Sequence, residues 1–134
     1  MSIQTKKFIV PIVIAASLTL SACGTKQDDA KEKKETTSAS MQGAKEMKQT
    51  LKDLKEQLKA KKTDEVKEAG EQLEKSWESF EDGVKDKDAA LYEKVETPLH
   101  TIEAGAKSAP LDVKTLTKAA EQLDAVLSDV EKLK

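Results

Sequence analysis

The sequence predicts an all-α protein, an up-down-up-down four-helix bundle over residues 41–134 that follows a disordered tether. Apolar residues recur every three or four positions in four successive segments, which is the period of one face of a helix. Short polar turns or a proline separate these segments, as expected for neighbouring helices of a bundle. No segment shows the alternating pattern of a strand. About a hundred residues suit a single domain with one core.

The first two predicted helices are joined by a polar turn, KKTDEV, for which Thr63 or Asp64 is the expected N-cap. The apolar stripe of the first segment consists of Met41, Ala44, Met47, Leu51, Leu54 and Leu58. The stripe of the second consists of Val66, Leu73, Trp77, Phe80 and Val84. Because Trp77 and Phe80 lie on this stripe, we expect them to anchor the core rather than to stack on a ligand.

Two further breaks delimit the third and fourth predicted helices. A DKD turn precedes the third stripe, which consists of Leu91, Val95, Leu99, Ile102 and Ala106. The sequence SAPLD then breaks the chain at Pro110, and Asp112 is the expected cap of the last helix. The fourth stripe consists of Leu116, Ala119, Leu123, Val126, Val130 and Leu133.

The N-terminus has the pattern of a secretory signal peptide, which we assign to residues 1–22. Lys6 and Lys7 form a basic flank, and the apolar run from Phe8 to Leu20 is too short for an ordinary membrane-spanning helix. No other segment is apolar enough to span a membrane. The sequence therefore predicts an exported protein.

The residues LSAC, from Leu20 to Cys23, resemble the lipobox of bacterial lipoproteins, in which the cysteine is lipidated and becomes the mature N-terminus. Cys23 is the only cysteine of the chain. The resemblance implies a diacylglyceryl group with two acyl chains of the palmitate type, and two chains suffice for stable anchoring. The expected location is the extracytoplasmic face of the cell membrane, with the membrane as a partner. The alternative is a plain signal peptide with a stray cysteine.

Residues 23–40 are the predicted lipidated cysteine and its tether. From Gly24 to Ser40 there is no large apolar side chain, and the segment carries four charges of each sign. Such a segment buries too little surface to offset the entropy of ordering it. We therefore expect it to be disordered.

Composition argues against two classes of function. The formal net charge is −2, and all 23 basic residues are lysines, so the arginine that commonly recognises phosphate and guanine is missing. We expect no nucleic-acid partner. The chain has one histidine, one cysteine and no glycine-rich phosphate loop, which leaves little from which to assemble a catalytic set. We expect no enzyme.

His100, the only histidine, lies in a polar stripe at the flank of the third apolar stripe. Glu96 precedes it by four residues and Glu103 follows it by three. Side chains at these spacings meet on a helix surface, so the three are able to share one cation. The alternative is that the charged stripe is only a solvated helix face.

The preceding helix carries a second acidic flank that includes Glu74 and Glu78. An antiparallel register puts Glu78 at the level of Glu96 and Glu74 at the level of His100. If the two flanks face each other, a carboxylate-rich site with one imidazole forms between helices, where bundles commonly build metal sites. Such donors suit iron or manganese, and zinc or copper less well.

Pro98 lies two residues before the histidine, where it removes a backbone donor from the predicted helix. Thr97 as N-cap and Pro98 at the first helical position would restart the helix. Such a kink either shapes a site or only lets the helix follow the core, and the sequence leaves both possibilities open.

The segment LHTIE, from Leu99 to Glu103, resembles the HxxE helix motif of imelysin-like proteins, which include bacterial extracytoplasmic iron-uptake proteins. The surrounding residues 90–112 and the segment WESFEDGVK, residues 77–85, are similar to the family's pattern as well. The family usually has glycine where this chain has Pro98. By position, the resemblance carries over only His100 and Glu103, and it implies an accessory role in iron handling outside the cytoplasm.

Two hypotheses for function follow. In the first, the bundle binds a metal ion, with iron favoured, or a metal complex at His100, Glu96 and Glu103 with Glu74 and Glu78, as an accessory to a membrane transporter. In the second, it is a non-catalytic interaction or scaffold lipoprotein that docks an envelope partner through one face of the bundle, and the acidic residues only solvate the surface.

Overall fold

The protein is described by a computed structural model that gives the backbone of residues 28–134 and the side chains of residues 37–134. The predicted signal peptide, Cys23 and residues 24–27 of the predicted tether lie outside the described residues.

The described part of the chain is all-helical, which confirms the predicted all-α class. Its helices are α1 (Asp28–Lys59), α2 (Thr63–Glu78), α3 (Glu81–Lys87), α4 (Ala89–Ala106) and α5 (Val113–Val130). Residues 28–134 contain no strand. Over the same residues, no helix combines the length and the apolar character that crossing a membrane requires.

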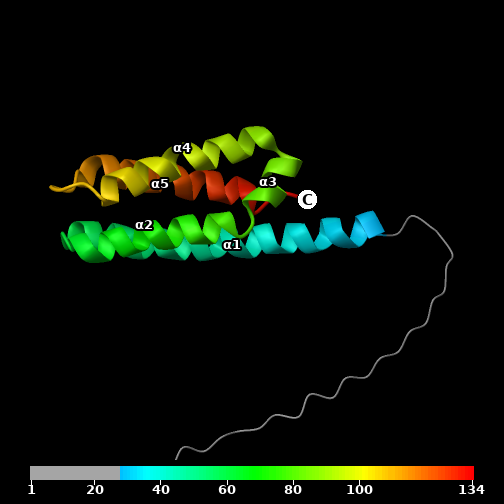
Figure 1. Ribbon diagram of the computed structural model, residues 1–134, viewed down its shortest axis with the longest axis horizontal. Helices are drawn as coiled ribbons and strands as arrows, with labels where there is room; N and C mark the ends of the chain where they lie inside the picture. Colours follow the sequence, from blue (N-terminus) through cyan, green and yellow to red (C-terminus); the bar gives the residue numbers. More distant parts are fainter. Residues whose placement is uncertain (1–27) are drawn as a thin grey trace, which may run out of the picture.

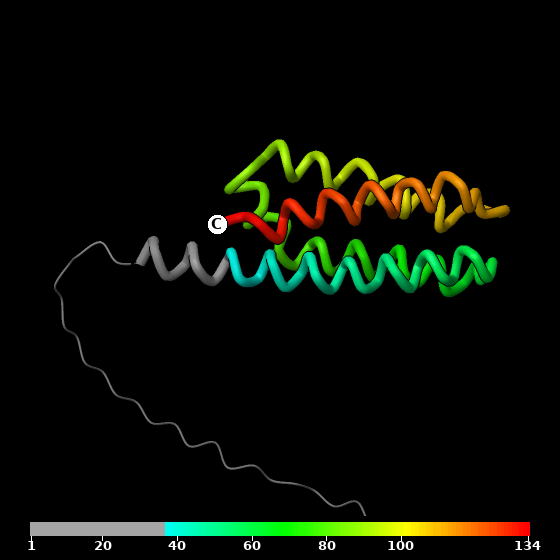
Figure 2. The backbone as a smooth tube through the Cα atoms, turned by 180° about the vertical axis from the view of Figure 1, so that it is seen from behind, coloured from blue at the N-terminus to red at the C-terminus, as the bar shows by residue number. Residues whose placement is uncertain are grey.

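The four long helices pack around one core (Figure 1). α1 contacts α2 and α5, α4 contacts α5 and α2, and the short α3 packs mainly against α4. The α1–α2 turn and the α4–α5 loop lie together at one end of the molecule, whereas α3 and the C-terminus lie at the other (Figure 2). We call the end that holds the α1–α2 turn and the α4–α5 loop the loop end.

α1 begins at Asp28, so residues 28–40 of the predicted tether are helical. This shortens the tether at its C-terminal side. The segment is rich in lysine, glutamate and alanine, which are strong helix formers. It also continues a helix that the core has already fixed, and extending a helix is far easier than nucleating one. Near the point where α1 reaches the core, the Lys87 ammonium group donates to the Thr37 hydroxyl.

The second predicted helix is interrupted, so the described chain has five helices where the pattern predicted four. α2 ends at Glu78, Phe80 has φ −142°, and α3 starts one residue later. The interruption lets the Phe80 ring lie directly over Gly43 of α1, where a Cβ atom would be 2.1 Å from the ring. Only glycine leaves room there, a feature that periodicity cannot reveal.

The predicted turns largely hold. Asp88 caps α4 by accepting from the Leu91 amide at 2.9 Å, and Asp112 caps α5 by accepting from the Thr115 amide at 3.0 Å. The start of α2 differs, because Lys62 occupies the cap position and Thr63 is already helical.

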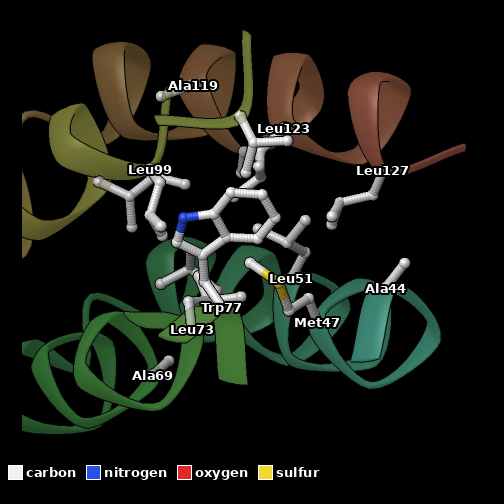
Figure 3. Packing of buried hydrophobic residues seen from close by; sticks show 14 of the residues in the cluster. Ala44, Met47, Leu51, Ala69, Leu73, Trp77, Leu99, Ala119, Leu123 and Leu127 are labelled. Carbon is white, nitrogen blue, oxygen red and sulfur yellow. The ribbon is translucent and has the colours of Figure 1, made fainter. Parts of the chain in front are cut away.

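The core contains most of the predicted stripe residues and, in addition, Ala69, Ala120 and Leu127 (Figure 3). Met41 is 38% exposed although the adjacent Ser40 is fully buried, so at this level α1 turns Met41 away from the core. On α5, Leu127 is fully buried although it was not predicted, whereas Val126 and Leu133 are only partly buried.

α4 runs through Pro98 without a break. Thr97 is not a cap, because it lies inside the helix and its hydroxyl donates to the carbonyl of Glu93 at 3.1 Å. Pro98 is itself buried, so it packs as an apolar residue of this helix.

Candidate functional site

α2 and α4 meet along an edge that is rich in carboxyl groups, which we call the acidic seam. Its side chains are Glu74 and Trp77 from α2, Glu81 from α3, and Tyr92, Glu96, His100 and Glu103 from α4. Glu74 contacts Glu103, whereas Trp77, which follows Glu74 on α2, contacts Glu96, which precedes Glu103 on α4. The two helices are therefore antiparallel, and their acidic flanks face each other.

Glu96 is the most heavily hydrogen-bonded carboxylate of the seam. One oxygen accepts from the indole nitrogen of Trp77 at 2.5 Å, and the other lies 3.1 Å from Nε2 of His100. The hydroxyl of Tyr92 also hydrogen-bonds to it. Only 17% of the Glu96 side chain is exposed, which suits a carboxylate supplied with several donors.

The Trp77 side chain explains why Glu96 lies here. The residue is 2% exposed, and its ring lies at the centre of the core (Figure 3). A buried indole N–H needs an acceptor. Glu96, one turn before His100, supplies that acceptor from the facing helix. The contact thus satisfies a core residue and fixes the carboxylate that His100 touches.

Glu74 and Glu103 meet across the seam. Burial is the main cause that raises the pKa of Glu103, and a hydrogen bond and the negative charge of Glu74 raise it further. Lys107, whose ammonium group is 4.0 Å from Glu103, and His100 act in the opposite direction. Only 14% of the Glu103 side chain is exposed. Two carboxyl groups this close are stabilised by sharing a proton or by a cation.

The other end of the seam shows the same accumulation of negative charge. Burial raises the pKa of Glu81, and the carboxylates of Glu96, Asp82 and Glu78 raise it further. Desolvation, Glu96 and Glu81 likewise raise the pKa of the Tyr92 hydroxyl. The cation above the Tyr92 ring is Lys85, 4.9 Å from the ring centroid.

The predicted site residues fall into two pairs, His100 with Glu96 and Glu103 with Glu74. Among the side chains of residues 37–134, no three histidine, cysteine, aspartate or glutamate residues are grouped so that they could hold a metal ion. The His100 side chain is 64% exposed, so it lies at the rim of the seam.

The contacts do not follow a single register: Trp77 meets Glu96 close to the predicted level, whereas Glu74 meets Glu103 about three residues beyond it. Glu74 meets Glu103 instead of His100, and Glu81 instead of Glu78 lies beside Glu96. Glu78 is exposed. The interruption between α2 and α3 brings Glu81 back to the seam. Trp77 was predicted only as a core residue, and its indole N–H was the one sequence signal for an acceptor on a facing helix.

Chemically, the seam offers carboxylate oxygens, an exposed imidazole and a phenol, with one lysine at each end. The carboxylates are hard donors that suit cations such as iron, manganese or calcium.

Comparison with known proteins adds no relative: no family model, curated protein or solved structure matches the chain.

Proposed function

We propose that the protein is a non-catalytic lipoprotein, anchored through Cys23 on the extracytoplasmic face of the cell membrane. The helices form an up-down-up-down four-helix bundle in which α3 continues α2 after the interruption. The bundle binds a divalent metal ion, with iron favoured, or a metal complex at the acidic seam, as an accessory to uptake by a membrane transporter.

The observation that carries this proposal is the meeting of Glu74 and Glu103 across two helices. Their carboxyl groups lie close enough to hydrogen-bond, which raises the pKa of Glu103. A divalent cation that replaces the shared proton would remove the repulsion between them and gain two oxygen ligands. Metal binding of this kind releases protons, so its affinity rises with pH.

His100 and Glu96 form a second pair on the same helix as Glu103, and metal binding at the seam would draw the two pairs together. Glu96 holds Nε2 of His100, which leaves the other ring nitrogen for a metal. Ligating histidines commonly use one ring nitrogen for the metal and the other for a carboxylate. An exposed imidazole beside half-buried carboxylates suits a metal that arrives as a complex and is passed on.

Thermal unfolding of the mature chain with and without Fe(II) or Mn(II) tests metal binding. A ligand that binds only the folded state raises the free energy of unfolding by about 2.7 kcal/mol at a hundred times its Kd. We expect this gain to be lost in Glu74→Gln, Glu103→Gln and His100→Ala. Glu68→Gln, at an exposed position of α2, is the matched control. Equal stabilisation of all five proteins, or of none, contradicts a metal site at the seam.

Membrane fractionation tests the anchor. We expect the wild-type chain in the membrane fraction and Cys23→Ala in the soluble fraction, because the variant cannot receive acyl chains. Cys23→Ala that stays with the membrane contradicts lipidation.

The second candidate function is a module that docks an envelope protein. The observation in its favour is the engagement of Glu96 by Trp77 and His100, which gives this carboxylate a structural role without a metal. A pull-down that recovers the same partner with and without a chelator, and equally with Glu103→Gln, supports docking over metal binding. Recovery that a chelator abolishes supports the metal.

A further inference from the structure

A line of hydrogen bonds leads from the core to the surface within the acidic seam. The indole nitrogen of Trp77 donates to one oxygen of Glu96 at 2.5 Å, and the other oxygen of Glu96 lies 3.1 Å from Nε2 of His100. Exposure increases along this line, from 2% for Trp77 to 17% for the Glu96 side chain and 64% for the His100 side chain. One carboxylate thus connects a core residue to the exposed imidazole.

Packing fixes the inner end of this line. The Trp77 ring lies among apolar side chains of the core (Figure 3). It meets the Phe80 ring edge-on, with the centroids 5.2 Å apart, and its centroid is 5.7 Å from that of Tyr92. A ring enclosed in this way cannot turn. Its N–H therefore has one direction, in which Glu96 places an oxygen.

The direction of the indole N–H decides the orientation of Glu96. A carboxylate only accepts hydrogen bonds. The indole of Trp77 on α2 occupies one oxygen, and the hydroxyl of Tyr92 on α4 is a further donor to the same group. Donors from two helices thus hold the carboxylate so that an oxygen faces Nε2 of His100.

The carboxylate in turn decides which nitrogen of His100 carries the proton. A neutral imidazole has one N–H donor and one acceptor nitrogen. Because the Glu96 oxygen accepts but cannot donate, Nε2 is the donor and Nδ1 keeps its lone pair. Ligating histidines are commonly held in this way, with a carboxylate on one ring nitrogen and the metal on the other.

From this geometry we infer that Trp77 is a positioning residue for His100: through Glu96, its buried N–H keeps the imidazole in the tautomer whose free nitrogen is Nδ1. The use of Nδ1 as a metal ligand rests on the function proposed above, whereas the tautomer does not. Glu96 then orients a ligand and does not itself coordinate the metal, because both of its oxygens are engaged.

Nitrogen-15 NMR of the metal-free chain at alkaline pH tests the tautomer. His100 is the only histidine, so its ring signals are identified directly. We expect the proton on Nε2 in the wild type. In Glu96→Gln, the amide oxygen still accepts from the indole N–H, which turns the NH₂ group toward His100. Nε2 must then accept, so we expect the proton on Nδ1.

Trp77→Phe in the Glu96→Gln background tests Trp77 itself. Phenylalanine keeps a ring in the core but has no N–H. The amide then meets only the Tyr92 hydroxyl, which fits either orientation because a hydroxyl both donates and accepts. We expect the two tautomers to coexist in this double variant. Leu58→Ala in the same background is the matched control, because it removes a core side chain near the loop end without touching the line, and the proton should stay on Nδ1.

Calorimetric titration with Fe(II) in the absence of oxygen measures the consequence for binding. We expect the affinity to fall about tenfold in Glu96→Gln, because the group that orients a ligating histidine is changed. Trp77→Phe alone should lower the affinity as well, since Glu96 loses the donor that holds it. Leu58→Ala alone should leave the affinity unchanged.

Three results overturn the inference. The first is a proton on Nδ1 in the wild type. The second is a proton that stays on Nε2 in Glu96→Gln, or on Nδ1 when Trp77→Phe is added to it. The third is an Fe(II) affinity that Trp77→Phe and Leu58→Ala change equally. The expected tautomers in a wild type that binds no Fe(II) would support the positioning of His100 and contradict only the metal site.

Discussion

The α1–α5 edge and the α2–α4 edge border the same core but carry opposite electrostatics. Across the first, the ammonium group of Lys48 on α1 donates to the Ser128 hydroxyl at 2.9 Å and to Glu131 at 3.3 Å. Across the second, Glu74 faces Glu103, and both are half-buried. One edge joins opposite charges and the other joins like charges.

Selection for stability alone would favour the α1–α5 edge and would not produce the α2–α4 edge. An ion pair across two packed helices contributes modestly to folding, whereas two carboxylates in contact oppose it. The core tolerates the acidic seam because burial of apolar side chains is the larger contribution. A group of charges that lowers stability and is not required for packing is a candidate for function.

The largest expected effect concerns the core that both edges share. We expect Trp77→Ala, under the acidic seam, to lower the free energy of unfolding by about 3–5 kcal/mol, and Leu123→Ala on α5 by about 2–5 kcal/mol. Both residues are almost fully buried. Urea denaturation measures both losses. A small loss of stability for Trp77→Ala, together with the expected loss for Leu123→Ala, would show that the core does not support the acidic seam.

The next effect distinguishes Glu96, a carboxylate that accepts a hydrogen bond from a buried group, from an exposed carboxylate of the same helix. We expect Glu96→Ala to lower stability by about 1–3 kcal/mol, because it leaves the buried indole N–H of Trp77 without an acceptor. Glu93→Ala, an exposed residue of the same helix, is the control and should change stability by less than about 0.5 kcal/mol. Equal effects of the two variants would contradict the role of Glu96 as the acceptor for Trp77.

A pH series sharpens the contrast further. Because the pKa of Glu103 is raised in the folded state above its ordinary value of 4.5, its proton is held more tightly when folded. The stability this provides is complete below pH 4.5 and is lost as the pH rises through the folded-state pKa.

We therefore expect Glu103→Gln to be more stable than the wild type by about 0.5 kcal/mol at pH 7, with the gap closing toward pH 4. Melting temperatures measured across this range provide the check. A variant that is less stable at neutral pH would mean that Glu74 and Glu103 do not repel each other.

The smallest effect is expected at the complementary edge. Lys48→Ala removes the contacts with Ser128 and Glu131 and should lower stability by about 0.3 kcal/mol at low salt. Added salt should reduce the loss. A loss that salt does not change would assign the effect to the buried stem of the lysine instead of its charge.

How far the sequence predicted the molecule depended on the kind of information involved. The helical period located the stripes, and Asp112 marked a helix start because its side chain caps within three residues. The caps expected at Thr63 or Asp64 and at Thr97 were wrong, because these residues lie inside α2 and α4. The interruption at Phe80 was missed, because it depends on Gly43 of another helix. The charged composition of residues 28–40 suggested disorder, yet a helix fixed by the core extends through them.

The candidate site divides in the same way. The stripe of Glu96, His100 and Glu103 and the acidic flank with Glu74 were visible from spacing along single helices. Their pairing was not, because it depends on the register and rotation of α2 against α4. The docking joined Glu74 to Glu103, and the interruption between α2 and α3 brought Glu81 rather than Glu78 beside Glu96.

By itself, the sequence determined the all-α class, most of the apolar faces and the cap at Asp112, because each depends on residues only a few positions apart. It also carries the lipobox-like LSAC segment, a signal that needs no fold. Only the tertiary structure decided that two acidic flanks meet and that Glu96 serves Trp77. Those features depend on how helices dock, and docking is set by the packing of the whole core.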